Sequence, residues 1–109
     1  MDCGMGHTPR RCQLLKANAF RSRKWLSAVG ELGDCVLCGT YGVQVAHRNE
    51  GKGMGLKCDD SLTAAICPEC HNSIDNGKEL SRDERRALMD KAIVLTIQRL
   101  AREGRITVK

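Results

Sequence analysis

Hydrophobic side chains recur along this chain with the periods of helices and strands. In residues 13–29 they return about every 3.6 positions and basic residues occupy many of the others, which predicts a basic amphipathic helix that ends at Gly30. Apolar residues recur with the same helical period from Leu88 up to Gly104. Ser81 and Glu84 precede these residues with the spacing of a capping box, so we expect a C-terminal amphipathic helix that packs over the core or against a partner subunit.

The residues between these two helices predict a small sheet followed by a short helix. Residues 43–47 alternate between apolar and polar side chains, which is typical of a strand, and the apolar run 62–66 predicts a second, buried strand. The intervening residues 48–57 contain three glycines within five positions and are expected to form a loop. Residues 69–76 then predict a helix, and residues 106–108 an additional edge strand. The expected fold class is therefore α+β.

Two cysteine couplets are the strongest chemical signal in the chain. Cys35 and Cys38 form the first couplet, and Cys67 and Cys70 form the second. Four thiolates in two C-x2-C couplets are typical of a structural Zn²⁺ site. Gly39 directly after the first couplet lets the backbone turn so that its amides point at sulfur. A small domain with only three aromatic residues also gains stability from such a metal staple.

The length of 109 residues has room for one small domain, since ordinary domains contain roughly 100–200 residues. Residues 1–12 show no apolar period, so we expect a mobile N-terminal tail and a single domain over residues 13–109, with its core at about 34–78. Three further cysteines and a histidine could form part of a second metal site, although their spacing matches no established ligand pattern: Cys3, His7, Cys12 and Cys58.

Cysteine usage and hydropathy indicate the compartment. The seven cysteines are an odd number, and tight couplets favour metal over the disulfides of a secreted protein. The first residues contain no apolar segment of the kind found in signal peptides. No stretch approaches the roughly 20 apolar residues that cross a bilayer. We therefore expect a reduced, cytoplasmic protein with no membrane partner.

The formal net charge of +5 is concentrated at the N-terminus. Residues 1–30 carry six basic side chains against the single acidic Asp2, whereas the basic and acidic side chains of residues 31–109 balance. This asymmetry predicts binding to a polyanion, most simply nucleic acid. The alternative is that these residues only solvate one face of a helix. Trp25 in this segment is expected to anchor the core rather than to stack on a base.

Three short motifs together resemble a known family. They are Ala46-His47, Gly53-x-Gly55-x-Lys57-x-x-Asp60 and Cys67-x-x-Cys70-His71-x-x-Ile74-Asp75. In the order strand, loop, strand and helix they are similar to the HNH, or ββα-metal (His-Me finger), endonucleases. More narrowly, they resemble a family of small predicted nucleases encoded by phages and prophages. The resemblance covers about residues 21–80 and implies a treble-clef-like ββα-metal core in a protein of the bacterial host cytoplasm.

The resemblance implies metal-dependent cleavage of DNA. Hydrolysis of a phosphodiester needs a base that takes a proton from water and a cation that stabilises the developing charge. His47 corresponds to the family's general base. His71 and Asp75 correspond to ligands of a catalytic Mg²⁺ or Mn²⁺, and their i, i+4 spacing places them on one face of a helix. Six basic residues are expected to contact backbone phosphates: Arg21, Arg23, Lys24, Arg48, Lys52 and Lys57.

The chain departs from the HNH pattern at two positions. Many of these enzymes have Asp or His before the catalytic histidine as a metal ligand, and this chain has Ala46, which the narrower phage family shares. The middle Asn of the signature is also missing. Asp60, or alternatively Asn72, is expected to orient His47 in its place.

Plainer interpretations exist for each candidate residue. His47 could be an ordinary polar residue at a strand end, His71 could replace a cysteine in the zinc shell, and Asp75 could simply end its helix. The whole chain could then be a non-catalytic zinc module that binds nucleic acid or protein, or a degenerate nuclease retained in a phage recombination or packaging assembly. The C-terminal helix permits a homodimer. The sequence leaves open whether DNA is nicked or broken and in which form it is bound.

Overall fold

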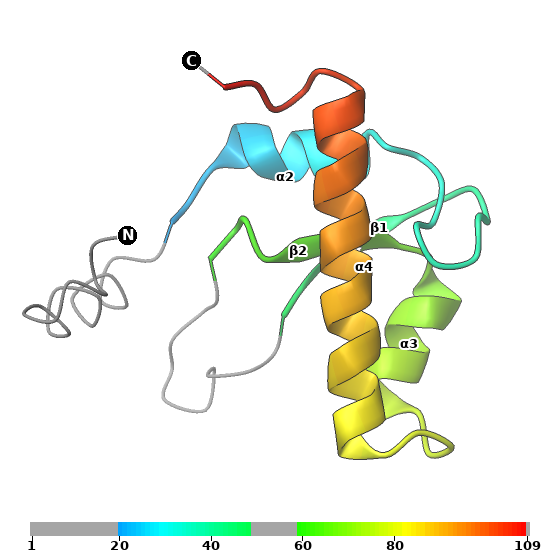
Figure 1. The fold of residues 1–109 in the computed structure, drawn as a ribbon. Helices are drawn as coiled ribbons and strands as arrows, with labels where there is room; N and C mark the ends of the chain where they lie inside the picture. Colours follow the sequence, from blue (N-terminus) through cyan, green and yellow to red (C-terminus); the bar gives the residue numbers. More distant parts are fainter. Residues whose placement is uncertain (1–19, 49–58, 109) are drawn as a thin grey trace, which may run out of the picture.

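The computed structural model describes residues 20–48 and 59–108 of the chain. Within these residues it is an α+β fold of three helices and a two-stranded antiparallel sheet (Figure 1). The elements follow one another as α2 (Arg23–Gly30), β1 (Gln44–His47), β2 (Thr63–Ile66), α3 (Pro68–Asn76) and α4 (Arg82–Arg102). The predicted α+β class and the order helix, strand, strand, helix, helix are confirmed for this part of the chain. The predicted tail over residues 1–12 and most of the predicted glycine-rich loop lie outside the described residues.

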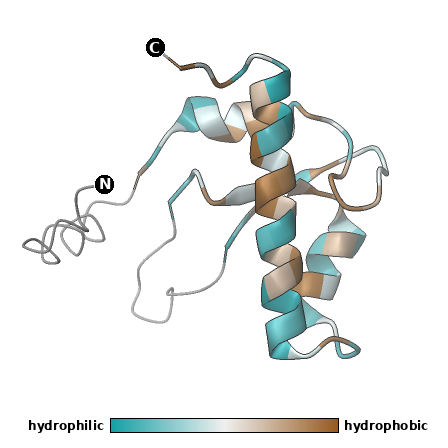
Figure 2. Ribbon diagram, viewed as in Figure 1, coloured by the Kyte–Doolittle hydropathy of each residue, from teal (hydrophilic) through white to brown (hydrophobic). Residues whose placement is uncertain are grey.

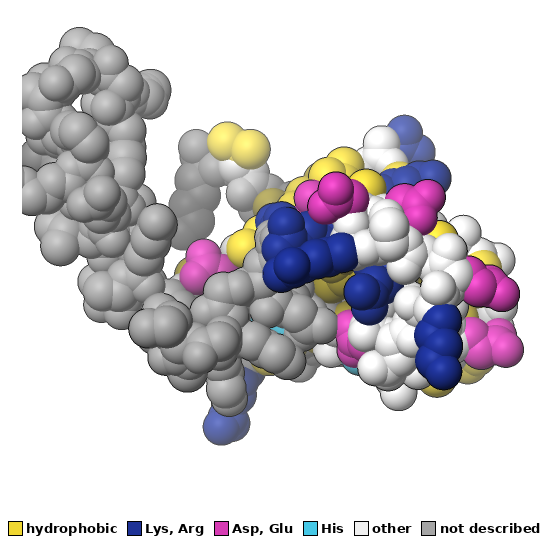
Figure 3. All heavy atoms as spheres, turned by 90° about the horizontal axis from the view of Figure 1, so that it is seen from below, with side chains coloured by type: hydrophobic (Ala, Val, Ile, Leu, Met, Phe, Trp, Pro, Cys, Tyr) yellow, Lys and Arg dark blue, Asp and Glu magenta, His cyan; other side chains and the backbone are white. Residues whose placement is uncertain are grey.

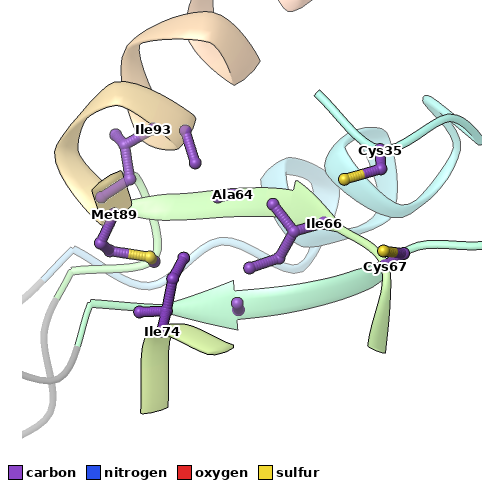
Figure 4. Packing of buried hydrophobic residues seen from close by; sticks show 9 residues of the cluster. Cys35, Ala64, Ile66, Cys67, Ile74, Met89 and Ile93 are labelled. Carbon is purple, nitrogen blue, oxygen red and sulfur yellow. The ribbon is translucent and has the colours of Figure 1, made fainter. Parts of the chain in front are cut away.

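The short sheet separates two hydrophobic clusters. Val45 pairs with Ala65 and Ala46 with Ala64, so successive pairs face opposite sides. Ala46 and Ala64 belong to a cluster with Ile66 of β2, Ile74 of α3, and three residues in the first half of α4, Met89, Ala92 and Ile93. Figure 4 labels Ala64, Ile66, Ile74, Met89 and Ile93 of this cluster. Ala65 belongs to the second cluster, which joins α2 to the end of α4: Val29, Leu32 and Leu100.

Helix α4 closes the outer edge of β2. The hydroxyl of Thr96 accepts a hydrogen bond from the Ala65 N–H at 3.1 Å and donates one to the Ala92 carbonyl at 2.8 Å. The Ala65 carbonyl accepts from the Val36 N–H at 3.0 Å. The backbone N–H and C=O of Ala65 that point away from β1 are therefore both hydrogen-bonded. The hydroxyl of the fully buried Thr96 has one donor and one acceptor as partners.

The predicted capping box begins α4. Ser81 accepts from the Glu84 N–H at 3.1 Å, and the Glu84 carboxylate accepts from the Ser81 N–H at 2.8 Å. The buried residues of the helix lie three or four positions apart and so share one face: Met89, Ala92, Ile93, Thr96 and Leu100. Figure 2 shows hydrophilic and hydrophobic residues along its whole length. Val94 and Ile97 are exposed, and a homodimer through this helix stays a prediction. Across residues 20–48 and 59–108, no helix combines the length and apolar character needed to cross a bilayer.

The predicted start of the N-terminal helix is wrong over the described residues. Phe20 to Ser22 are not helical, and α2 begins only at Arg23. Ser22 has an extended backbone, and its hydroxyl accepts from the Trp25 N–H at 3.1 Å, which makes it an N-cap. Trp25 packs against the second cluster and meets the Phe20 ring edge-on at 6.2 Å. It is a packing residue, as expected.

The predicted edge strand at residues 106–108 is also wrong. The N–H groups of Arg105 and Ile106 bond to the Leu100 carbonyl at 2.9 and 3.3 Å, so this segment turns back over the end of α4. Ile106 packs against the second cluster, and Val108 is 98% exposed. The Ile106 N–H, which a strand would use for pairing, is therefore used to end the helix.

Candidate metal centre and active site

The four cysteines of the two couplets come together beyond the end of β2. Their sulfur atoms all lie within 4.8 Å of one another, and the Sγ atoms of Cys38 and Cys67 are 3.6 Å apart. A tetrahedral zinc ion with Zn–S bonds of about 2.3 Å separates its sulfurs by about 3.8 Å. The cluster could therefore hold a structural metal such as zinc. Among the described residues it is the one group of three or more His, Cys, Asp or Glu side chains with ligand atoms this close.

Backbone amides hold the sulfurs in place. The N–H groups of Leu37 and Cys38 each donate to Cys35 Sγ at 3.4 Å, and the Cys70 N–H donates to Cys67 Sγ at 3.5 Å. Gly39 has a φ of +82°, the left-handed region that favours glycine, which agrees with the expected turn after Cys38. With the C-x2-C spacing, the sulfur of the first cysteine in each couplet accepts a hydrogen bond from the backbone N–H of the second.

The thiols favour different protonation states. The Thr40 hydroxyl lies 3.2 Å from Cys38 Sγ, and its hydrogen bond is the main cause that lowers the pKa of Cys38 to about 6. Burial, followed by the neighbouring thiols, raises the pKa of Cys70 far above its usual range. Four thiolates this close repel one another, so full ionisation of the cluster requires a compensating cation. A divalent metal would supply that charge.

His47 is held by a buried carboxylate. Its Nε2 lies 3.0 Å from Asp60 Oδ1, while Asp60 Oδ2 accepts from the Ser22 N–H at 2.8 Å and Arg21 Nη1 lies 3.3 Å from Oδ1. The hydrogen bond from His47, with the Ser22 amide and the Arg21 charge, holds the pKa of Asp60 below its usual value despite its burial. An ionised carboxylate only accepts, so Nε2 of His47 carries a proton. In the neutral ring the lone pair is then on Nδ1, and the side chain is 38% exposed.

His71 has partners at both ring nitrogens. Its Nδ1 lies 2.8 Å from Gln44 Oε1 on β1, and its Nε2 lies 3.1 Å from Asp75 Oδ2 one helical turn away. Because the Gln44 oxygen accepts, Nδ1 carries the proton, and in the neutral ring the lone pair of Nε2 faces the Asp75 carboxylate. Two electron-pair donors converge there, and a proton or a metal ion is needed between or beside them.

The His71–Asp75 pair fits two neighbouring ligands of a divalent ion. Adjacent ligands of an octahedral ion with bonds of about 2.0–2.1 Å are about 3.0 Å apart, close to the observed 3.1 Å. If the oxygen and nitrogen of the Gln44 amide exchanged places, the proton of neutral His71 would lie on the other ring nitrogen. The amide NH2 would donate to Nδ1 and Nε2–H would donate to Asp75, which makes a hydrogen-bonded chain without an ion.

The two histidine pairs lie at different ends of β1. Gln44 begins the strand and His47 ends it, about 10 Å away at about 3.3 Å per residue, and alternation turns their side chains to opposite faces. Helix α3 carries Asp75 toward the His47 end, because Ile74 packs with Ala46 and lies at the arrowhead of β1 in Figure 4. Within the part of the chain that the structure describes, no third ligand joins His71 and Asp75.

The other predicted site residues have varied surroundings. Arg48 forms an ion pair with Asp90 of α4 at 3.3 Å. Asn72, the alternative to Asp60, accepts from the side chain of Asn76 at 3.1 Å. Six residues named from the sequence lie outside the described ranges: Cys3, His7, Cys12, Lys52, Lys57 and Cys58.

Two contacts of this site were missed from the sequence. In the sequence, Gln44 is only a polar position in a predicted strand, and Thr40 is only the second residue after the Cys35–Cys38 couplet. The position of Gln44 opposite Ile66, the last residue of β2 before Cys67, places it beside the start of α3. That register is a property of the folded sheet, and no short motif carries it.

These residues define a small α+β protein with a four-cysteine cluster suited to a metal ion. Compared with known proteins, the chain matches no family model, no curated protein and no solved structure. The likeness to HNH nucleases therefore stays a prediction from the three sequence motifs.

Proposed function

We propose that this protein is a metal-dependent endonuclease that hydrolyses phosphodiester bonds in DNA, as the phage-family resemblance implies. The observation that carries the proposal is the 3.0 Å contact between His47 Nε2 and the buried Asp60 carboxylate. A partly exposed imidazole at a strand end is held through Nε2 by a buried carboxylate, which leaves Nδ1 to accept a proton. This is the arrangement that a general base requires.

In the proposed reaction, His47 takes a proton from water at Nδ1 as the water oxygen attacks phosphorus. The bond from phosphorus to the 3′ oxygen breaks, and that oxygen takes a proton from solvent. Asp60 keeps the ring oriented and stabilises the imidazolium that forms, because its carboxylate remains 3.0 Å from Nε2. Arg21 shares the Asp60 Oδ1 atom with His47, so its positive charge lies beside the base. A phosphate bound there would be attracted by that charge.

His71 and Asp75 would hold the catalytic ion. Because Gln44 and His47 lie at different ends of β1 and on opposite faces of the sheet, this role requires that the bound phosphate reach from His47 Nδ1 around the end of the strand to α3. A divalent cation supplies stabilisation of the negative charge that develops on the phosphate and on the departing oxygen. An imidazole and a carboxylate together suit Mn²⁺ better than Mg²⁺, which prefers oxygen ligands alone. With two protein ligands, the ion depends on water and substrate for the rest of its coordination, so weak binding to the free protein is expected.

The alternative function is a non-catalytic zinc module that binds nucleic acid or protein. One observation favours it: in the described residues, His71 and Asp75 have no third protein ligand, and the Gln44 contact admits a chain of hydrogen bonds without an ion. This alternative predicts one metal per chain. The nuclease proposal predicts a second, weaker site for Mn²⁺.

The test is conversion of supercoiled plasmid by the purified protein in Mg²⁺, Mn²⁺ or EDTA, beside a His47→Ala variant with unchanged zinc content. Cleavage by the wild type alone, stopped by EDTA, supports the proposal. If both proteins are inert on plasmid, single-stranded and branched DNA yet still bind them, the zinc module is the better account. A catalysed reaction that His47→Ala leaves intact would remove the proposed base.

A further inference from the structure

A hollow of about 440 Å³ lies beside α2, where the segment after α4 returns to it. It is lined by residues from α2 and its C-cap together with one from that segment: Arg23, Lys24, Ser27, Ala28, Glu31 and Arg105. Two of these, Arg23 and Lys24, were predicted from the sequence to contact phosphate. The participation of Arg105, 74 positions from Glu31 along the chain, was not visible there.

The hollow carries more positive than negative charge. Arg105 is held in place by Glu31 at 2.6 Å and by Glu103 at 3.2 Å. Arg23 and Lys24 are exposed and have no ion-pair partner among the described residues. The first turn of α2 contains no acidic residue, so these two cations lie unrelieved at the positive end of the helix dipole. An anion bound in the hollow would balance both the charges of Arg23 and Lys24 and the positive end of the α2 dipole.

Helix α4 provides the contrast. It also begins with an arginine after a serine N-cap, but its first turn contains Asp83 and Glu84. Figure 3 views the molecule from the end of α4 that lies lowest in Figure 1, and basic and acidic side chains are interspersed over the described part of that face. The first turn of α4 therefore offers Arg82 two carboxylates, whereas the first turn of α2 offers Arg23 none.

The hollow is connected to the His47 centre through α2. The N-cap of this helix, Ser22, donates its N–H to Asp60, which also bonds to His47. The 8 residues of α2 extend about 12 Å, which corresponds to about three nucleotides of a B-form strand at about 3.4 Å each. A strand with one phosphate at Arg21 and His47 could thus place a later phosphate in the hollow.

We propose that this hollow binds the phosphodiester backbone of nucleic acid, at nucleotides next to the one held at His47. The inference rests on the proposed nuclease function and adds a second phosphate site to it. A nucleic acid fits better than an acidic protein, because the lining offers cations and a hydroxyl but Ala28 as its one apolar side chain. Protein interfaces are usually centred on Trp and Tyr as well as Arg, and the lining contains no aromatic residue.

The test measures binding without cleavage. In full-length His47→Ala protein, the affinity for a fluorescent 20-nucleotide single strand and the matching duplex is measured by anisotropy between 50 and 200 mM salt. The test variant adds Arg23→Gln and Lys24→Gln. The matched control adds Arg82→Gln and Lys78→Gln instead. It removes the same two positive charges near the N-terminal end of α4, away from the hollow.

The test variant is expected to weaken binding by about 10-fold or more at low salt and to lower the salt slope by about one per lost phosphate contact. The control should change affinity by less than about twofold. Equal losses in both variants, or none in the test variant, would overturn the phosphate site. Equal competition by polyglutamate at matched charge would also overturn it and favour an acidic protein. Because His47 is absent throughout, failure of plasmid cleavage does not affect this result.

Discussion

The cysteine cluster and the histidine pairs are built in different ways. Cys35 and Cys67 are buried, have short side chains and receive backbone amides at sulfur, so local chain geometry sets their positions. The ring of His47 is 38% exposed and that of His71 is 29% exposed, and each is positioned by a side chain from elsewhere in the fold. Substitutions in the cysteine cluster should therefore unfold the protein, whereas substitutions at the histidine pairs should lower the proposed activity and leave the fold intact.

The largest expected effect is on the cysteine cluster. Cys67→Ser, or removal of metal by a strong chelator, should unfold the described domain, since a structural zinc site contributes about 10–16 kcal/mol, as much as the whole stability of about 5–15 kcal/mol of an ordinary domain. Far-ultraviolet circular dichroism and metal content per chain are the measurements. Cys58→Ser is the control, because the described cluster does not contain that residue. A Cys67→Ser protein with native helicity and no metal would contradict the proposed role of zinc.

The next effect separates orientation from charge at His47. Asp60→Ala removes the partner of Nε2 and should lower the cleavage rate by about 100-fold, within the range of a positioned general base. Asp60→Asn keeps an oxygen that can accept from Nε2–H and should recover part of that loss. The rates are measured on plasmid with zinc content checked. A rate for Asp60→Ala equal to that of the wild type would show that His47 needs no orienting partner.

The same contrast explains what could be predicted from the sequence. The cysteine couplets, the capping box of Ser81 and the order of elements all follow from spacings within a few residues, and the structure confirms them. The late start of α2 does not follow in this way. It depends on Ser22 and on its contact with Asp60, 38 positions away, which overrides the helical pattern before Arg23.

Two more residues show the limit of periodicity. Thr96 interrupts the apolar face of α4 in the sequence, yet it is fully buried because its hydroxyl satisfies the edge of β2. Gln44 contacts His71 only because the sheet register places it beside α3. Such contacts between distant elements have no local signature, so the motifs predicted the candidate residues without their partners.

A smaller effect is expected at Gln44. Gln44→Leu removes the acceptor for Nδ1 of His71, so the ring no longer has a preferred tautomer and should bind Mn²⁺ about 10-fold more weakly, the usual cost of losing such a partner. The dissociation constant is measured by electron paramagnetic resonance of free Mn²⁺. Gln98→Leu on the exposed face of α4 is the matched control. Equal Mn²⁺ affinity in all three proteins would favour the hydrogen-bonded chain without an ion.

The smallest effect concerns stability in acid. The pKa of Asp60 is lowered in the folded protein, first by the hydrogen bond from His47 and also by the Ser22 amide and the Arg21 charge. A depressed pKa contributes stability above the pKa of the unfolded chain, and this contribution is lost as the pH falls through the folded value. The wild type should therefore exceed Asp60→Asn in free energy of unfolding above about pH 5, and the difference should shrink below about pH 4.

Urea unfolding of both proteins at each pH measures this difference. Acid also weakens cysteine–metal bonds, and loss of the metal is expected to unfold the domain, so the comparison uses only pH values at which both proteins retain their metal. Asn is the suitable reference because its amide is similar in shape and does not titrate. A difference that stays constant below pH 4, or that grows there, would mean that Asp60 is not held as a carboxylate. The tautomer assigned to His47 would then lose its physical basis, since it depends on Asp60 being an acceptor only.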